Sequence, residues 1–111
     1  MDNFTDVKIE IFVPQDHLKK LREKLGEIGA GRIGNYDHCA TVSPVQGYWR
    51  PLPGANPFDG EVGKISEAAE YKLEVNCARE LVREALKVIR QNHPYEEPLI
   101  RVIPLVNHLF R

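Results

Sequence analysis

The 111-residue sequence has only two cysteines, Cys39 and Cys77, and so lacks a framework of disulfide bonds. We expect both to be reduced thiols in a cytoplasmic protein. No apolar run approaches the roughly 20 residues that a membrane-spanning helix needs, and residues 1–6 lack the basic and hydrophobic regions of a signal peptide. An excess charge is also missing, because 15 basic residues face 16 acidic ones. We therefore expect no membrane and no nucleic acid among the partners.

The composition is that of one globular domain. Hydrophobic residues make up 42% of the chain and charged residues 28%, which is enough apolar material for a core and an ordinary charged surface. A chain of this length fits a single compact unit. No linker or low-complexity segment divides it, so we predict one domain over residues 1–111.

Two stretches of the sequence repeat one another weakly, 64 positions apart. Lys8-Ile9-Glu10-Ile11 corresponds to Lys72-Leu73-Glu74-Val75. Apolar and polar residues alternate in both copies, which is typical of a strand with one buried face. The predicted inward residues are Val7, Ile9, Ile11 and Val13 in the first copy and Tyr71, Leu73, Val75 and Cys77 in the second. Lys8, Glu10, Phe12, Lys72, Glu74 and Asn76 then lie on the other face.

A helical pattern follows each strand. The apolar residues recur three and four positions apart, as on one side of a helix. They are Leu18, Leu21, Leu25 and Ile28 in the first copy and Leu81, Val82, Ala85, Leu86 and Ile89 in the second. Pro14 suits the first helical position, and the glycines from Gly26 to Gly31 indicate where the first helix ends.

Residues 36–52 predict a β-hairpin, with arms at 36–44 and 48–52 and with Gln46 and Gly47 at or near its turn. Residues 99–105 predict a last strand. This order of elements indicates an α+β fold, a ferredoxin-like split βαβ sandwich with two helices on one face of the sheet and an extended β-hairpin. The other face is amphipathic, and we expect it to be solvated or packed against other subunits. We expect the hairpin to make subunit contacts.

Three further motifs occur in order along the chain. They are GAGRIGNYDHC at 29–39, RPLPGANPFDGEVG at 50–63 and HPYEEP at 93–98. Together they resemble the central insert domain of YqfO-type proteins, in the dinuclear-metal-centre family named after an NGG-interacting factor. The resemblance covers about residues 5–105 and implies a CutA/PII-like fold that assembles as a homotrimer. The two lobes that hold the metal centre in that family have no counterpart here. The resemblance therefore implies a freestanding CutA-like trimer and does not extend their hydrolase activity to this chain.

The 93–98 motif places an imidazole, a phenol and two carboxylates together after the second helix. Imidazole and carboxylate groups bind divalent and transition metal ions, so we predict His93 and Glu96 as metal ligands and Tyr95 and Glu97 as ligand-binding residues. Adjacent residues of an extended segment point to opposite sides, so Glu96 and Glu97 are not expected to share one ion. A structural alternative stays open, in which His93 stabilises the helix end and the acids pair with arginines.

Residues 32–39 supply a second set of candidates. On a strand, His38 lies on one face and Asp37 with Cys39 on the other. His38 is then the better metal ligand, and in a trimer it could meet His93 or Glu96 of the next subunit. Cys39 is either a core residue or a soft ligand. Arg32 and Asn35 are predicted to form a polar wall that binds a ligand.

Other residues have simpler expected roles. We predict Cys77 in the core, Phe58 as the residue that anchors its loop to a core or a neighbour, and His17 and His108 as surface residues.

Three functions stay open. We favour a noncatalytic trimeric module that binds a metal ion or small ligand in a cleft between subunits. The alternatives are a hydrolase whose acid–base pair is His93 with Glu96, and a module that only docks on a partner protein. No nucleophile stands in a supporting pattern with a base, so the sequence leaves enzymatic activity undecided.

Overall fold

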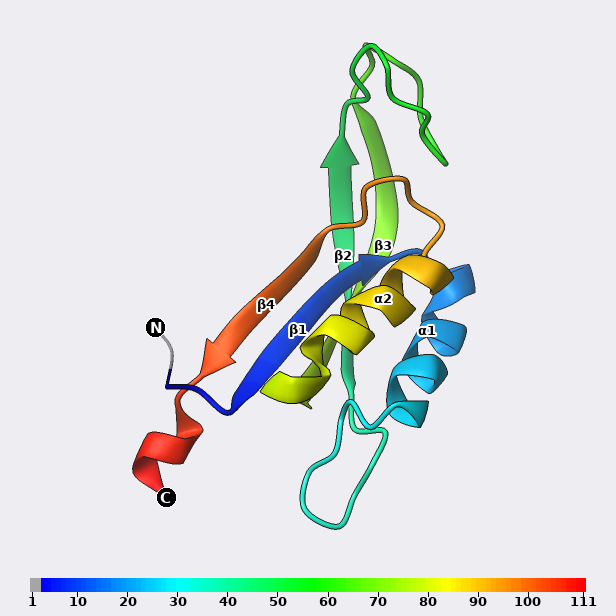
Figure 1. The fold of residues 1–111 in the computed structure, drawn as a ribbon. Coiled ribbons are helices and arrows are strands. Elements are labelled where there is room, and N and C mark those ends of the chain that lie inside the picture. Colours follow the sequence, from blue (N-terminus) through cyan, green and yellow to red (C-terminus); the bar gives the residue numbers. More distant parts are fainter. Residues whose placement is uncertain (1–2) are drawn as a thin grey trace.

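The computed structural model describes residues 3–111, which form one antiparallel sheet with two helices packed on one face (Figure 1). The elements in chain order are β1 (Asp6–Val13), α1 (Gln15–Glu27), β2 (Thr41–Trp49), β3 (Ser66–Ala78), α2 (Val82–Asn92) and β4 (Ile100–Leu105), with short 3-10 turns at Arg79–Leu81 and Asn107–Phe110. The strand order β2-β3-β1-β4 confirms the predicted ferredoxin-like sandwich. Within residues 3–111, neither helix is long and apolar enough to cross a membrane.

The alternating pattern places the core as predicted. Along β1, Val7, Ile9, Ile11 and Val13 are all buried beneath the helices. β3 adds Leu73, Val75 and Cys77, and the helices add Leu21, Leu25, Ala85 and Ile89. β1 pairs with β3 in antiparallel register, with Ile9 opposite Val75. The two copies of the sequence repeat therefore lie side by side at the centre of the sheet.

The first helix begins one residue later than predicted. Pro14 keeps an extended backbone and stands directly before α1, so it caps the helix instead of occupying its first turn. After the helix, Gly31 has a φ of +87°, a conformation that suits glycine. Its N–H donates to the Asn76 carbonyl at 2.7 Å, and its carbonyl accepts from Cys39 N–H at 2.9 Å. A Cβ at Gly31 would lie 2.5 Å from the Cys39 carbonyl oxygen, so a glycine is needed here.

The predicted turn at Gln46 and Gly47 is wrong. β2 runs through both residues to Trp49, and the connection to β3 is the longer segment 50–65. β2 and β3 continue past the last pair of β1 with β3, which joins Val13 to Tyr71. Residues 45–49 and 66–70 therefore form a two-stranded extension, which we call the arm, and residues 50–65 form the arm loop. Figure 1 shows the arm rising beyond the helices; this extended hairpin is formed by β2 with β3 and not within residues 36–52.

The strand predicted at residues 36–40 is also wrong. β2 begins at Thr41, and the preceding residues form a loop in which Ile33 and Tyr36 make an isolated bridge. His38 has a positive φ of 57°, outside the range of a strand. Strand alternation therefore does not decide which way Asp37, His38 and Cys39 point.

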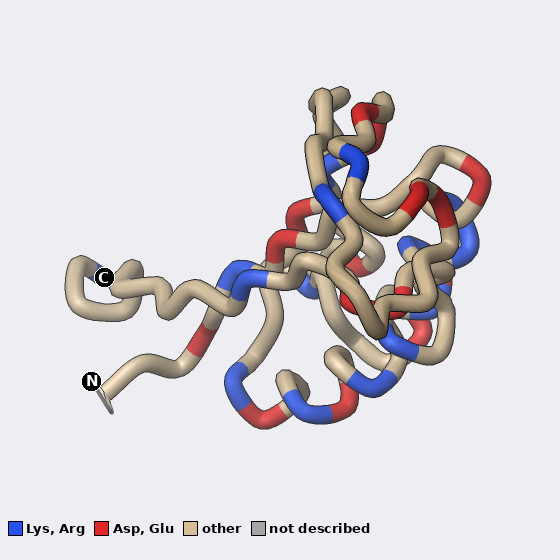
Figure 2. Tube along the Cα trace, turned by 90° about the horizontal axis from the view of Figure 1, so that it is seen from above, with Lys and Arg blue, Asp and Glu red and all other residues tan. Residues whose placement is uncertain are grey.

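The sheet face without helices carries a small ion cluster. Lys8 Nζ lies 2.7 Å from Glu74 Oε2 and 3.1 Å from Glu10 Oε2. The hydrogen bond from Lys8 lowers the pKa of Glu10. The Arg101 guanidinium lies 3.6 Å from Glu10 and 5.2 Å from the centre of the Phe12 ring. Acidic and basic residues are also interleaved along the helical turns (Figure 2).

Candidate functional site

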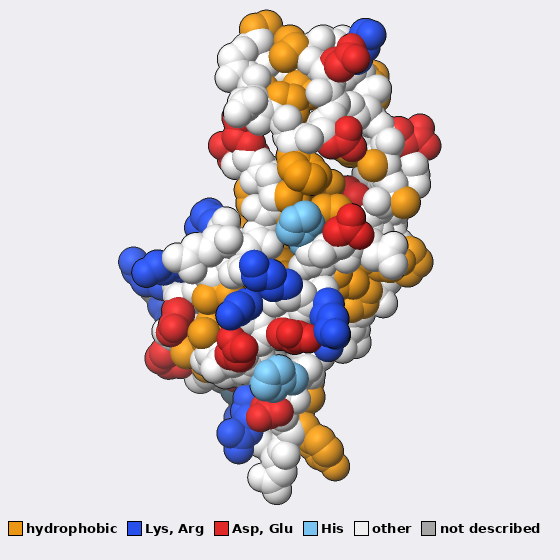
Figure 3. All heavy atoms as spheres, turned by 90° about the vertical axis from the view of Figure 1, so that its right-hand side faces the viewer, with side chains coloured by type: hydrophobic (Ala, Val, Ile, Leu, Met, Phe, Trp, Pro, Cys, Tyr) orange, Lys and Arg blue, Asp and Glu red, His pale blue; other side chains and the backbone are white. Residues whose placement is uncertain are grey.

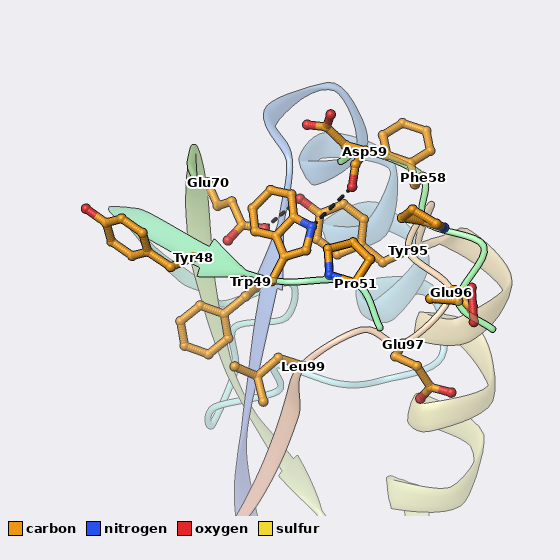
Figure 4. A pocket seen from close by; sticks show the side chains of 13 residues that line it. Tyr48, Trp49, Pro51, Phe58, Asp59, Glu70, Tyr95, Glu96, Glu97 and Leu99 are labelled. Carbon is orange, nitrogen blue, oxygen red and sulfur yellow. Dashed lines mark hydrogen bonds between the residues drawn. The ribbon is translucent and has the colours of Figure 1, made fainter. Parts of the chain in front are cut away.

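A pocket of about 300 Å³ lies where the arm and its loop meet the segment between α2 and β4 (Figure 4). We call it the acidic pocket, because four of its lining residues are carboxylates and none is Lys or Arg. The acids are Asp59, Glu70, Glu96 and Glu97, and the other lining residues are Phe12, Tyr48, Trp49, Pro51, Ala55, Pro57, Phe58, Tyr95 and Leu99.

The register of the arm explains how Glu70 and Trp49 reach the pocket. Val45 pairs with Glu70, and Trp49 with Ser66. Residues two apart on a strand share a face, so Glu70 and Trp49 both lie on the face turned away from the buried Leu73. Phe12 pairs with Lys72 and lies on that same face. Three segments distant in sequence thus contribute to one side of the sheet.

Gly47 leaves the space that Glu70 occupies. A Cβ built on Gly47 would lie against Oε1 of Glu70, much closer than such atoms approach. A glycine inside a strand commonly indicates such a close approach. Gly47, which suggested a turn in the sequence, therefore makes room for the buried carboxylate.

His93 fixes the loop that carries Tyr95. Its Nε2 lies 2.7 Å from the Phe12 carbonyl oxygen, and its Nδ1 accepts from the Tyr95 N–H at 3.1 Å. Since Nδ1 is the acceptor, Nε2 holds the proton and donates it to Phe12 in the neutral ring. Burial lowers the pKa of His93, which favours this neutral form. Both ring nitrogens are therefore occupied within the chain.

Glu70 is the most deeply placed acid of the pocket, with 7% of its surface exposed. Its Oε2 accepts a hydrogen bond of 2.6 Å from the Tyr95 hydroxyl. Burial, followed by this hydrogen bond, raises the pKa of Tyr95, so the phenol stays protonated and donates. Within residues 3–111, Glu70 has no Lys or Arg at ion-pair distance, and its Oε1 accepts no hydrogen bond.

Aromatic rings form the walls around this carboxylate. The Tyr95 ring centre lies 6.3 Å from that of Trp49 and 6.0 Å from that of Phe58. Trp49 Nε1 donates to the Asp59 carbonyl at 3.1 Å. His17 on α1 meets Phe58 edge-on with ring centres 6.1 Å apart. Phe58 therefore contacts α1 and Tyr95 from the arm loop, while 59% of its surface stays exposed outside the core.

Glu96 ties the arm loop to the segment before β4. Its Oε2 accepts a hydrogen bond of 2.6 Å from the Asn56 N–H, across 40 positions of sequence. Glu97 has no such bond within the described residues and is exposed. Figure 4 shows both at the rim of the pocket. The predicted arginine partners of these acids are absent within residues 3–111.

The structure brings together only some of the predicted site residues. Tyr95, Glu96 and Glu97 line the acidic pocket, with His93 directly behind Tyr95. Arg32 instead lines a second hollow that also includes Asp37, and its Nε donates to the Gly34 carbonyl at 2.7 Å. Asn35 is exposed on the same loop.

His38 lies at the C-terminal end of α1. Its ring sits where a Cβ of Gly26 would be, and its Nδ1 is 3.0 Å from Asp37 Oδ1. The acidic pocket meets the other end of α1, at His17. Within one chain, His38 and His93 are therefore apart, and their meeting across a subunit boundary stays a prediction.

The thiols and the other histidines complete the comparison with the sequence. Cys77 is buried, as predicted, and burial raises the pKa of its thiol to about 11. Cys39 is half-buried. His17 and His108, which were predicted at the surface, are both half-buried: His17 packs on Phe58, and His108 Nε2 lies 2.7 Å from the Asn3 carbonyl.

The side chains of one chain do not fit a metal centre. No group of three or more His, Cys, Asp or Glu residues within residues 3–111 is arranged to hold a metal ion. The predicted hydrolytic pair is not formed either, because His93 bonds to Phe12 and Tyr95 while Glu96 bonds to Asn56.

Sequence reasoning missed Trp49, Asp59 and Glu70. One signal was present for Glu70, which continues the polar face of β3 formed by Lys72 and Glu74. Glu70 lies beside the 93–98 motif because β2 and β3 continue together into the arm. A turn at Gly47 would have ended β2 before that point. Nothing in the sequence placed Trp49 beside Tyr95.

Comparison with known proteins identifies the fold and the relatives. A family model described as CutA1 divalent ion tolerance protein matches residues 61–109. The GTP cyclohydrolase 1 type 2 homolog of Halalkalibacterium halodurans is 38% identical over 100 residues, which cover 90% of this chain and 27% of that protein. A solved Bacillus cereus protein related to NIF3 superposes with a TM-score of 0.81 at 34% identity, over 92% of this chain and 26% of that one. This chain is a CutA-like relative of the NIF3-related proteins.

The CutA structures share the fold over most of their length. The periplasmic divalent cation tolerance protein CutA from Archaeoglobus fulgidus superposes with a TM-score of 0.67 at 21% identity, covering 90% of this chain and 83% of that chain. The recognition of a CutA/PII-like domain related to YqfO-type proteins is thus confirmed. This CutA-like chain spans about a quarter of the length of the curated relatives it matches.

Proposed function

We propose that this chain is a noncatalytic, homotrimeric binding module that takes a cation, either a metal ion or a small ligand, in the acidic pocket. The observation that carries the proposal is a pocket of about 300 Å³ with four carboxylates and no Lys or Arg in its lining. A pocket of this size suits a small ligand. A cleft lined by one sign of charge concentrates ions of the opposite sign.

Exposed apolar side chains support self-association. On the arm and its loop these are Tyr48, Leu52, Phe58, Val62 and Ile65, and on β4 they are Val102 and Ile103. β2 and β4 are the two edges of the sheet and pair on one side only. Contacts between unlike surfaces of identical copies can close into a ring. A homotrimer is also what the resemblance to YqfO-type inserts implies.

The match to the CutA1 divalent ion tolerance family model supports a divalent metal ion as one candidate. Glu96 is its proposed carboxylate donor. A neighbouring subunit would supply the remaining ligands, with His38 as the proposed imidazole donor, because one chain has no complete set. His93, with both nitrogens bonded, holds the loop that carries Glu96.

Calorimetric titration tests the cation site. The protein should bind at least one cation from a panel of zinc, copper, nickel, manganese and small amines, with saturable heat. The variant Glu96→Gln should weaken binding of a metal ion about tenfold, because a neutral amide replaces a charged donor. Glu84→Gln, an exposed change on α2, should leave the affinity unchanged. If no cation of either kind binds up to millimolar concentration, the proposal is wrong.

Sedimentation equilibrium tests the assembly. The expected mass at micromolar concentration is three times the chain mass of 12.7 kDa. A monomer at this concentration would reject the homotrimer and leave the acidic pocket as a site within one chain.

A further inference from the structure

We infer that the ligand of the acidic pocket is a small organic amine, whose ammonium group meets the Glu70 carboxylate and whose carbon body packs on Trp49 and Tyr95. This inference rests on the proposed cation site and names the chemical class that fills it.

The charge of Glu70 is the first reason. The side chain is nine-tenths buried and lines the pocket, yet the described chain gives it one hydrogen bond, from the Tyr95 hydroxyl, and no cationic partner. Buried charges in proteins are normally paired, because desolvation of a lone ion is unfavourable. The free Oε1 of Glu70 is therefore suited to accept a hydrogen bond from a cation that enters the pocket.

The walls of the pocket are the second reason. Nine of the thirteen lining residues are aromatic, aliphatic or proline, among them Trp49, Phe58 and Tyr95. An ammonium group near an aromatic face is attracted by the ring as well as by a carboxylate. Figure 3 shows hydrophobic side chains gathered between the arm and the helices, with acidic side chains beside them. Apolar walls suit a ligand with a carbon body and are poor surroundings for a hydrated metal ion.

The rigidity of Glu70 is the third reason. Tyr95 holds one of its carboxylate oxygens, and the other oxygen lies over Gly47, where any larger residue would meet it. Tyr95 is itself fixed by His93, which bonds to β1. A carboxylate held in this way presents one oxygen toward one point, which suits a single ammonium donor. It contributes only one donor to a metal ion, which prefers at least four.

A matched set of ligands tests this inference on the full chain. The probes are 2-phenylethylamine, 2-phenylethanol and phenylacetate, which share an aromatic body and differ in the charge of the head group. Trp49 is the only tryptophan of the sequence, so its fluorescence reports directly from the pocket wall. The amine should change this fluorescence saturably and bind at least tenfold more tightly than the alcohol, with the phenylacetate anion weakest.

Two variants identify the carboxylate. Glu70→Gln keeps an oxygen to accept from Tyr95 but removes the charge, and it should weaken the amine about tenfold without weakening the alcohol. Glu84→Gln, far from the pocket, should leave both affinities unchanged. Circular dichroism checks that Glu70→Gln keeps the fold.

The outcomes separate this inference from the function on which it rests. Equal binding of the amine and the alcohol would overturn the proposal of an amine ligand. Binding of metal ions without binding of amines would overturn it too, but would leave the proposed cation site in place. If neither amines nor metals bind, both proposals fail. Amine binding that disappears as the protein self-associates would also overturn it, because a Lys or Arg of a second copy then fills the pocket.

Discussion

The His93 side chain fixes the position of the loop that carries Tyr95. The sequence predicts His93 as a metal ligand, because a histidine near two acids has the chemistry for that role. In the structure its ring joins the Phe12 carbonyl of β1 to the Tyr95 N–H, and each nitrogen has one partner. The same side chain thus works as a neutral connector between the sheet and the pocket.

The neutrality of His93 predicts a dependence of stability on pH. Burial lowers its pKa in the folded chain, so the unfolded chain binds the proton more readily. Its contribution is fully present above the unfolded pKa of about 6.5 and is lost as the pH falls below that value. We expect the free energy of unfolding in urea to fall between pH 7.5 and 5.5, with a His93 contribution of at most about 1.4 kcal/mol per pH unit.

Two variants separate this effect from the titration of other groups. His93→Gln keeps a donor and an acceptor but does not titrate, so its stability should fall less over the same range. His108→Gln should keep the slope of the unmodified chain, because His108 is held by a single bond to Asn3 at the surface. Equal slopes for the unmodified chain and His93→Gln would show that His93 is not the group responsible.

At the scale of elements, the sequence predicts the core well and the arm poorly. Alternation in β1 and β3 reflects one buried face, so the inward residues Ile9 and Leu73 follow from pattern alone. The prediction at Gly47 was wrong because glycine is common both in turns and at strand positions where a side chain of the neighbouring strand lies over the backbone. Only the structure shows that the Glu70 side chain lies over Gly47.

The acidic pocket could be predicted only in part for a related reason. The 93–98 motif indicated a site by its composition, and Tyr95, Glu96 and Glu97 do line the pocket. The other wall comes from the arm, and the bond from Asn56 N–H to Glu96 that joins the two segments spans 40 positions. No local pattern encodes a contact between two irregular segments at that separation.

The bond between Asn56 and Glu96 predicts a specific loss of order in the arm loop. Glu96→Ala removes the acceptor of the Asn56 N–H, so that amide should exchange with solvent about tenfold faster, together with its neighbours. Hydrogen exchange followed by nuclear magnetic resonance measures the change. Glu97→Ala is the matched control, since Glu97 bonds to nothing within residues 3–111, and it should leave Asn56 unchanged. Similar acceleration in both variants would mean that charge, and not this bond, orders the loop.

At the scale of the molecule, the described chain is elongated, with extents of 49 × 30 × 22 Å. The arm projects at one end, and the C-terminal turn lies toward the other (Figure 1). The arm loop carries several exposed large apolar side chains, among them Ile65, which is 75% exposed, and Leu52, which is 57% exposed. A projecting apolar segment of this kind is suited to contact another copy.

Charged substitutions on the arm loop should therefore weaken assembly. The double variant Leu52→Asp, Ile65→Asp places two carboxylates on the apolar surface, and it should raise the concentration needed for assembly at least tenfold by sedimentation equilibrium. Both residues lie outside the core, so the circular dichroism spectrum should not change. Lys87→Asp on the exposed side of α2 is the control and should assemble normally. A variant that assembles as tightly as the unmodified chain would exclude the arm loop from the interface.

The bonding of His93 has a further consequence for the speed of ligand capture. Tyr95 and Glu70 are already held in place in the folded chain. The loss of conformational entropy on ordering this loop therefore occurs during folding and does not weaken ligand binding. Capture should then be a single step whose observed rate rises linearly with ligand concentration, without a slow phase. Differences in affinity among ligands would arise from how long each one stays bound.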